Sequence, residues 1–535
     1  MQKYFEFLNK NIWIILLISL VTILLQDLTG AVVLSDPFHY GEYFASSVIF
    51  FTKQSVDFTP LTIHGALDFI PALIARNIWG SDSYFLPTYF LYKIINVTSS
   101  LILLAIAFDL IKDNKNRWIV LLSLSIAAPL LVGYRDIVLL TTLYLFLKIN
   151  KNSLETSTDI IILVIFGVIT ALGLFWSFDR GISGAASFGV ATLLLTIRNK
   201  KYVFSLLTFF FSIFIISFYF QTFSLVNYIE NIKVLMETSN QWSYGWKRGP
   251  VIASLFAAGF NLTVIICVMM ACHINKSLLS RFPELILFIF LSIFMLKIGT
   301  NRADWGHVYS SLWIPILMLF YFKNENIFEK SIAVRLIFLL LLIAFAISIK
   351  DMVYLPVLLV GLMAYLVFSH VETFCSNDVN VTYIAFVIIL LFFIFPTSIK
   401  FANDKYKWLA HIYSPPTNNS ASTEGVRWVS DRLIRSKSTC VFDLSNNGVI
   451  NGLTTLPSCS RFTYPVYAGL VHETELINAV RETSPPAIVY SSTYWSYSID
   501  GKSMRDRFPQ LDIFLLQQYP NMECANGYCI RYLKD

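Results

Sequence analysis

Long apolar runs separated by short polar stretches are the feature that most limits the folds open to this chain. A helix needs roughly 17–25 apolar residues to cross a bilayer, and the sequence offers about thirteen such runs, some of them short. They lie at 12–29, 85–110, 118–133, 137–149, 159–177, 184–197, 202–221, 251–273, 283–299, 307–323, 332–348, 352–369 and 381–399. Hydrophobic residues make up 56% of the chain and charged residues 14%, unlike a soluble protein. We therefore expect a polytopic α-helical membrane protein.

The distribution of Lys and Arg predicts its orientation. With the N-terminus in the cytoplasm, most loops assigned to that side are basic, for example 112–117 and 198–201. The large loops 30–84 and 222–250 then face outward, and an odd number of spans places the C-terminus outside as well. The net charge of +6 fits this cytoplasmic excess better than nucleic-acid binding. We expect the bacterial inner (plasma) membrane, with a periplasmic C-terminus.

The composition changes near residue 400, which divides the chain into a transmembrane domain (1–400) and a soluble α/β domain (401–535). A linker rich in Pro, Asn and Ser marks the boundary. Alternating helices and strands are expected after it, at 423–436, 439–444, 472–483, 487–490 and 528–533.

The cysteines indicate whether this second domain lies in an oxidising or a reducing compartment. Cys440, Cys459, Cys524 and Cys529 all lie in the polar C-terminal part. An even number in one exposed domain favours two disulfides and an oxidising compartment. Of the three possible pairings we favour Cys440–Cys459 with Cys524–Cys529; the alternative is four free thiols.

Two outward segments are expected to lie along the membrane surface as amphipathic helices. In residues 60–80, His64 and Asp68 have the i, i+4 spacing of one helical face. The loop 222–250 combines an amphipathic stretch with an aromatic, basic turn.

Charged residues gather where the outward loops meet the membrane. Ionisable groups at membrane depth are costly and usually face a cavity or one another. The set comprises Asp36, Glu42, Arg135–Asp136, Asp179–Arg180, Lys247–Arg248, Arg302, Asp304, His307 and Lys350–Asp351. It predicts a polar cavity open to the outside, although each pair alone could be a charge at the interface that reaches into water.

Chemistry on the outer face has to use a donor held in the membrane, because nucleotide-sugars and ATP are absent there. Sugar transfer from a lipid phosphate needs a carboxylate to deprotonate the attacking hydroxyl. It also needs cations to hold the departing phosphate. The outward loops contain both kinds of residue.

An acidic motif just after the first span, a large first outer loop with interfacial segments, many spans and an outer C-terminal domain together resemble the GT-C superfamily of integral-membrane glycosyltransferases. The resemblance covers the architecture of nearly the whole chain. It implies an inverting hexosyl- or pentosyltransferase with a polyprenyl-phosphate-sugar donor and a cell-envelope glycan or lipid-linked acceptor. Members carry Asp, Asp-Asp or Glu-x-Asp in that loop, whereas this chain has Ser35–Asp36–Pro37 and then Glu42.

The candidate general base is Asp36, with Glu42 as the second choice; Asp36 could instead open a turn before Pro37. His39 lies one helical turn from Glu42 and could bind the acceptor or tune that carboxylate. His64 and Asp68 could line the acceptor side or form an interfacial pair. A divalent metal ion held by Asp36, His39 and Glu42 is conceivable.

Candidates for the donor phosphate are cations beside aromatic residues. They are Lys247 and Arg248 with Trp246, Arg302 with His307, and in second rank Arg135 and Arg180. The alternative for 246–248 is an aromatic belt with basic anchors. Tyr- and Ser-rich stretches at 458–469 and 491–500 could stack sugar rings, but loops of the α/β domain are favoured. A flippase of lipid-linked saccharide and a non-enzymatic envelope scaffold remain alternative functions.

Overall fold

The computed structural model describes part of the expected site. The described ranges are 12–27, 37–48, 61–80, 84–110, 131–151, 157–219, 225–242, 284–301, 310–324, 421–491 and 504–534, with scattered residues at 121–129 and 258–273.

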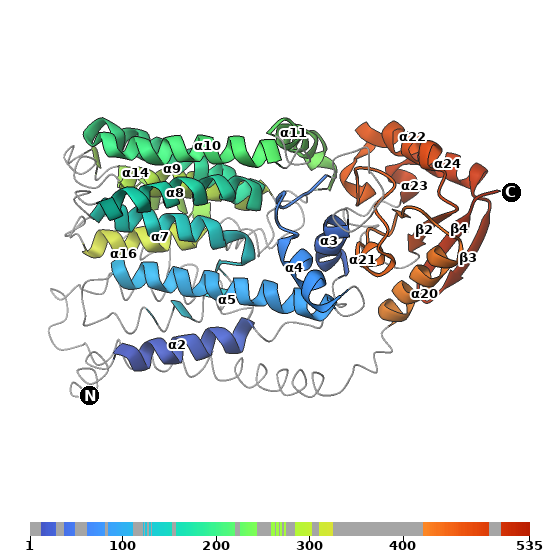
Figure 1. Cartoon of the computed structure of the whole chain (residues 1–535), viewed down its shortest axis with the longest axis horizontal. Coiled ribbons are helices and arrows are strands. Elements are labelled where there is room, and N and C mark those ends of the chain that lie inside the picture. The colour runs from blue at the N-terminus through green and yellow to red at the C-terminus, as the bar shows by residue number, and fades with distance from the viewer. Residues whose placement is uncertain are drawn as a thin grey trace.

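Apolar helices lying side by side form one half of the molecule (Figure 1). They are α2 (Ile12–Asp27), α5 (Phe85–Leu110), α7 (Ile137–Lys151), α8 (Ser157–Trp176), α9 (Phe178–Arg198), α10 (Val203–Tyr219), α14 (Glu284–Asn301) and α16 (Trp313–Asn324). Within the described ranges, four helices are long and apolar enough to cross a membrane: Pro87–Leu110, Thr158–Trp176, Phe178–Arg198 and Lys200–Phe218. The bundle is therefore that of a membrane protein.

Each of these helices coincides with a predicted span. The expected spans 332–348, 352–369 and 381–399 lie outside the described residues, and 118–133 and 251–273 lie partly outside them. The expected number of about thirteen spans thus stays a prediction.

Helix α9 begins earlier than the sequence indicated. The stretch 178–183 was expected to be an outward loop, but Ser177 alone separates α8 from α9. So sharp a reversal needs close helix contact: a Cβ on Gly181 would lie 2.2 Å from the Gly173 carbonyl oxygen. Asp179 in the first turn also suits the positive end of the helix dipole, and Ser177 donates a 2.6 Å hydrogen bond to it.

Further helices cover one end of the bundle, namely α3 (Pro37–Val48), α4 (Ile70–Trp79) and α11 (Leu225–Trp242) (Figure 1). The expectation of one helical face for His64 and Asp68 was wrong, because both precede α4. Pro71 near the start of α4 suits a first helical turn. The segment before it is fixed differently: Leu67 N donates to Phe175 O at 2.8 Å and Phe178 N to His64 O at 2.7 Å.

The C-terminal region carries a four-stranded sheet in the order β1-β2-β4-β3. Strands β1 (Phe442–Asp443) and β2 (Ala487–Ser491) are parallel, and β4 (Tyr528–Tyr532) pairs antiparallel with β2 and β3 (Asn521–Ala525). Its helices are α20 (Ala421–Arg435), α21 (Val449–Thr454), α22 (Glu473–Thr483), α23 (Met504–Arg507) and α24 (Pro509–Gln518). The predicted helices and strands occur close to their expected positions. Strand β3 was missed, although Asn526–Gly527, both at positive φ, is a common two-residue hairpin turn.

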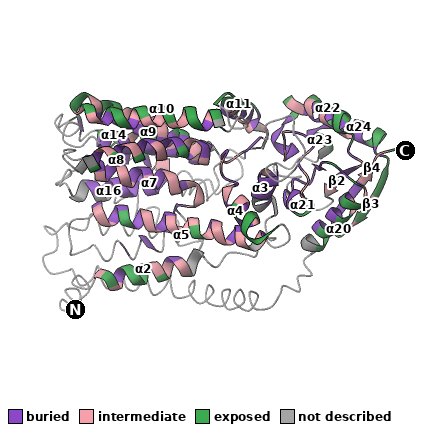
Figure 2. Ribbon diagram, in the orientation of Figure 1, coloured by how far each residue is buried: buried purple, intermediate pink, exposed green. Residues whose placement is uncertain are grey.

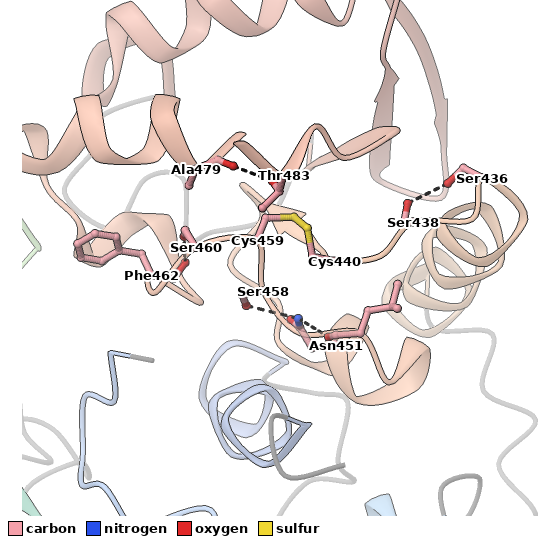
Figure 3. Close-up of a disulfide and its surroundings, with 11 residues drawn as sticks. Ser436, Ser438, Cys440, Asn451, Ser458, Cys459, Ser460, Phe462, Ala479 and Thr483 are labelled. Carbon is pink, nitrogen blue, oxygen red and sulfur yellow. Dashed lines mark hydrogen bonds between the residues drawn. A yellow bond between two sulfur atoms is a disulfide. The ribbon is translucent and has the colours of Figure 1, made fainter. Parts of the chain in front are cut away.

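Both favoured disulfides are present. Cys440 bonds Cys459, joining the residues before β1 to the segment that follows α21 (Figure 3). Cys524 bonds Cys529 across the β3–β4 hairpin, where the two residues are direct partners. The predicted pairing is therefore confirmed.

The C-terminal region packs on the bundle through α3 and α21, both largely buried (Figure 2). Phe44 and Tyr84 share an apolar cluster with Val449 and Ile450. The two helices approach at glycines, since a Cβ on Gly448 would lie 2.1 Å from the Gly41 carbonyl oxygen. Residues just after the first span are thus enclosed by residues more than 400 positions away.

Candidate functional site

Glu42 on α3 is a carboxylate buried where the bundle meets the C-terminal region, with 8% of its surface exposed. His64 Nε2 lies 2.8 Å from Glu42 Oε2. On the other oxygen, the Tyr467 hydroxyl donates a hydrogen bond of 2.9 Å to Oε1. Buried carboxylates need such partners, and here they come from two distant segments.

Asp68 is a second buried carboxyl beside Glu42. Burial and, after it, the negative charge of Glu42 raise the pKa of Asp68 well above its usual value. The shift favours the protonated form of Asp68 next to the Glu42 carboxylate. Both groups line a pocket with about 300 Å³ of empty space. Its other walls are Ser46, Leu61, Thr62, Ile63, Thr463 and Tyr464.

Tyrosines pack beside this acid-lined pocket. Tyr43 stacks on Tyr92 with ring centroids 4.0 Å apart, and Tyr134 meets both rings edge-on. The Tyr92 hydroxyl donates to the backbone oxygen of Asp68. Burial raises the pKa of Tyr43 far above its ordinary value, so this phenol stays neutral. These rings fix the backbone that presents Asp68.

Arg135 connects the acid-lined pocket to a second, cationic site. Its Nη1 lies 3.2 Å from His64 Nδ1 and 3.5 Å from Asp179 Oδ2. Because a guanidinium can only donate, Nδ1 must accept, which leaves the His64 proton on Nε2 facing Glu42. This tautomer follows from the hydrogen-bond partners. His64 thus joins a carboxylate and a cation through its two ring nitrogens.

Arg180 is the second cation and is almost fully buried at 3% exposure. Its Nε lies 3.1 Å from Asp136 Oδ1, its Nη2 donates to Ser310 Oγ at 2.8 Å, and Nη1 contacts Asp179. Behind Ser310, the neighbouring Ser311 accepts from Asn261 at 3.3 Å. The guanidinium is therefore held rigidly by several helices.

A narrow pocket lies between α7, α8 and α9 beside the two arginines. It is lined by Arg135, Val138, Leu139, Thr142, Thr170, Gly173, Arg180, Gly181, Gly184, Ala185 and Phe188. We call it the arginine-lined pocket. Its cations and the carboxylates of the first pocket thus lie at the same end of the bundle.

The structure brings together five of the candidate residues: Glu42, His64, Asp68, Arg135 and Arg180. The remaining candidates are not placed. Those outside the described residues are Asp36, Trp246, Lys247, Arg248, Arg302 and His307, and only the backbone of His39 is described.

The suggested metal ligands include Asp36 and His39, so that ligand set stays a prediction. Elsewhere in the described ranges, no group of three or more His, Cys, Asp or Glu side chains is arranged to hold a metal ion.

Tyr467 is the contact that sequence reasoning missed. Its segment, 458–469, was noted for its tyrosines but favoured as a loop of the α/β domain. Thr463 and Tyr464 of the same segment line the acid-lined pocket. No local spacing could have paired Tyr467 with Glu42, since 425 positions separate them.

The chain matches no family model and no curated protein. Two solved structures similar to it are the oligosaccharyltransferase AglB from Archaeoglobus fulgidus, in complex with an inhibitory peptide and a dolichol-phosphate, and ArnT from Cupriavidus metallidurans bound to undecaprenyl phosphate. AglB is 11% identical, with 99% of this chain and 75% of that chain covered and a TM-score of 0.46. ArnT is 11% identical, with 97% of each chain covered and a TM-score of 0.44.

The matches to AglB and ArnT concern the fold alone, and the resemblance to the GT-C superfamily rests on the sequence architecture described above. At these TM-scores they carry no argument about the activity of this chain.

Proposed function

We propose that this chain is a membrane glycosyltransferase that moves a sugar from a polyprenyl-phosphate carrier to a hydroxyl acceptor. The observation that carries the proposal is the position of His64, whose ring nitrogens join Glu42 to Arg135. Transfer from a lipid phosphate needs a base for the acceptor and cations for the leaving group. Both are present within one connected group of side chains.

Glu42 is the general base of the proposed reaction. It takes the proton of the acceptor hydroxyl, whose oxygen forms a bond to the anomeric carbon as the bond from that carbon to the phosphate breaks. Attack opposite the leaving group inverts the anomeric centre. Asp68 is not assigned this role, because its raised pKa favours the protonated form. Asp36 remains the other candidate.

The arginine-lined pocket is the proposed position of the lipid phosphate. Asp136 and Asp179 orient its two guanidinium groups and also neutralise much of their charge. Further cations are needed to hold a departing phosphate, and Lys247, Arg248 and Arg302 remain the proposed source. The aromatic Trp246 and the imidazole of His307 would then border the donor.

The remaining assignments belong to the same proposal. The acceptor is a cell-envelope glycan or lipid-linked saccharide on the outer face of the bacterial inner membrane. Residues 401–535 form the periplasmic domain, and the two disulfides support an oxidising compartment for it.

The test is transfer of labelled sugar from synthetic polyprenyl-phosphate-sugars by the full chain in lipid nanodiscs. Replacement of a general base lowers rates by about 10²–10⁴-fold, so Glu42→Gln should nearly abolish transfer. Ser46→Ala is the matched control, since Ser46 lines the same pocket without charge. Full activity of Glu42→Gln would remove Glu42 from the role, and Asp36→Ala would be examined next.

A further inference from the structure

We infer that Tyr467 of the C-terminal region is a positioning residue for Glu42, so that the carboxylate is correctly oriented only while that region is docked on α3. The inference rests on the proposed function, because it takes Glu42 as the base. Its foundation is the 2.9 Å hydrogen bond between two side chains that are 5% and 8% exposed.

His64 and Tyr467 contact the two oxygens of Glu42 separately. His64 contacts Oε2 from the membrane side of the site, and Tyr467 contacts Oε1 from the C-terminal region. A carboxylate held at one oxygen can rotate about its terminal side-chain bond, which has a broad energy profile. The second contact removes that freedom and fixes the plane of the carboxylate.

Tyr467 is itself rigidly placed. It ends a short 3₁₀ helix, Pro465–Tyr467, whose first residue is a proline with a fixed φ. The Tyr467 amide donates to Tyr464 O at 3.0 Å, and the Val466 amide donates to Asn446 Oδ1 at 3.1 Å. The rings of Tyr464 and Tyr467 are nearly parallel, 12° apart. The position of the Tyr467 hydroxyl is therefore fixed relative to the rest of the C-terminal region.

Several contacts dock that region around the site. Leu61 N donates to Arg461 O at 2.8 Å, close to the pocket wall. The Arg461 guanidinium lies 3.0 Å from Glu230 on α11. The backbone contact of Gly41 with Gly448 completes the set. Separation of the two regions would break these contacts and withdraw the hydroxyl from Glu42.

The groups that face Glu42 predict the effect of losing this hydroxyl. His64 and Asp68 approach from the loop before α4, Arg135 acts through His64, and Tyr43 neighbours Glu42 on α3. Tyr467→Phe leaves all of these in place and removes one donor to a charged carboxylate. Protonation of the base then becomes easier, and its activity is lost at a higher pH.

The experiment compares Tyr467→Phe with Tyr84→Phe in the nanodisc assay. Tyr84 is the matched control, because its hydroxyl donates to the Gly452 carbonyl oxygen at 3.2 Å in the same interface but does not line the acid-lined pocket. In Tyr467→Phe, we expect the acidic limb of the kcat/KM profile to move up by about one pH unit, the size of one hydrogen bond to a charged group. We also expect kcat at neutral pH to fall about tenfold with the donor KM unchanged, and Tyr84→Phe to keep the wild-type profile.

Two failures are distinguishable. A wild-type protein that transfers no sugar overturns the proposed function. An active wild type whose pH profile and kcat are unaltered by Tyr467→Phe overturns the role of Tyr467 alone. Equal shifts in both variants would also overturn it, because they would indicate a general effect of the interface.

Discussion

The acid-lined pocket and the arginine-lined pocket are built in different ways. The first combines α3, the loop before α4 and residues 463–467, which are far apart in the sequence. The second lies among α7, α8 and α9, which follow one another along the chain. In the first, two carboxyls lie together and the pKa of Asp68 is raised, whereas in the second two aspartates balance two arginines. The acid-lined pocket therefore depends on the docking of the C-terminal region on α3. The arginine-lined pocket depends on the packing of neighbouring helices against one another.

The largest expected effect separates the two carboxyls of the acid-lined pocket. Glu42→Gln removes the base and should lower transfer by about a thousandfold. Asp68→Asn should stay within about threefold of wild type, because the raised pKa of Asp68 favours a neutral carboxyl, which the amide resembles. Steady-state rates of both variants in nanodiscs provide the measurement. Equal losses in the two variants would show that Asp68 works as an anion.

Arg180 provides the next largest effect, on stability. Arg180→Met leaves Asp136 buried without its cation, which costs about 3–5 kcal/mol. Arg135→Met should cost less, since the Arg135 side chain is 22% exposed against 4% for Arg180. Thermal unfolding of both variants, measured in one and the same detergent, compares their losses of stability. A smaller loss for Arg180 than for Arg135 would contradict the rigid role assigned to Arg180.

A pH effect on stability is expected from Asp443, a buried residue of β1 in the C-terminal region. Burial raises the pKa of Asp443 to about 6, above the 3.8 of an ordinary aspartate. The unfolded chain therefore loses this proton first, and stability of the C-terminal region should fall as pH rises from about 4 to 6 and then level off. The loss is about 3 kcal/mol at 1.36 kcal/mol per pH unit.

Asp443→Asn tests this origin, because an amide cannot ionise. Asp443 accepts from the amides of Ser445 and Asn447, which lead to Gly448 and α21. Unfolding midpoints measured between pH 4 and 7 should lose their slope in the variant. An unchanged slope would place the titrating group elsewhere.

The comparison of the pockets also explains what the sequence could predict. Arg135, Asp136, Asp179 and Arg180 were expected at one end of the bundle, because their distance from the apolar runs fixes their depth in the membrane. The disulfide pairing was equally accessible, since Cys524 and Cys529 are close in sequence. Such features follow from local order along the chain.

Other features depend on tertiary contacts that no local pattern contains. His64 and Asp68 have helical spacing, yet backbone hydrogen bonds to Phe175 and Phe178 hold their segment in an irregular form. Helix α9 starts at Phe178 because Gly173 and Gly181 let two backbones meet. The contact of Tyr467 with Glu42 requires the C-terminal region to fold against α3.

The smallest expected effects come from two glycines, one at the contact of α21 with α3 and one at the contact of α9 with α8. Gly448→Ala would place a Cβ 2.1 Å from the Gly41 oxygen, and Gly181→Ala would place one 2.2 Å from the Gly173 oxygen. Each overpacks a backbone contact and should cost about 1–3 kcal/mol. Gly448→Ala should separate α21 from α3 and reproduce the shifted pH profile of Tyr467→Phe, since each change removes the hydrogen bond from the Tyr467 hydroxyl to Glu42. Gly181→Ala should lower the unfolding temperature and shift that profile less, because α8 and α9 are connected to Glu42 through the segment of His64. If Gly181→Ala shifted the acidic limb as far as Gly448→Ala, the two pockets would have to be treated as one mechanical unit.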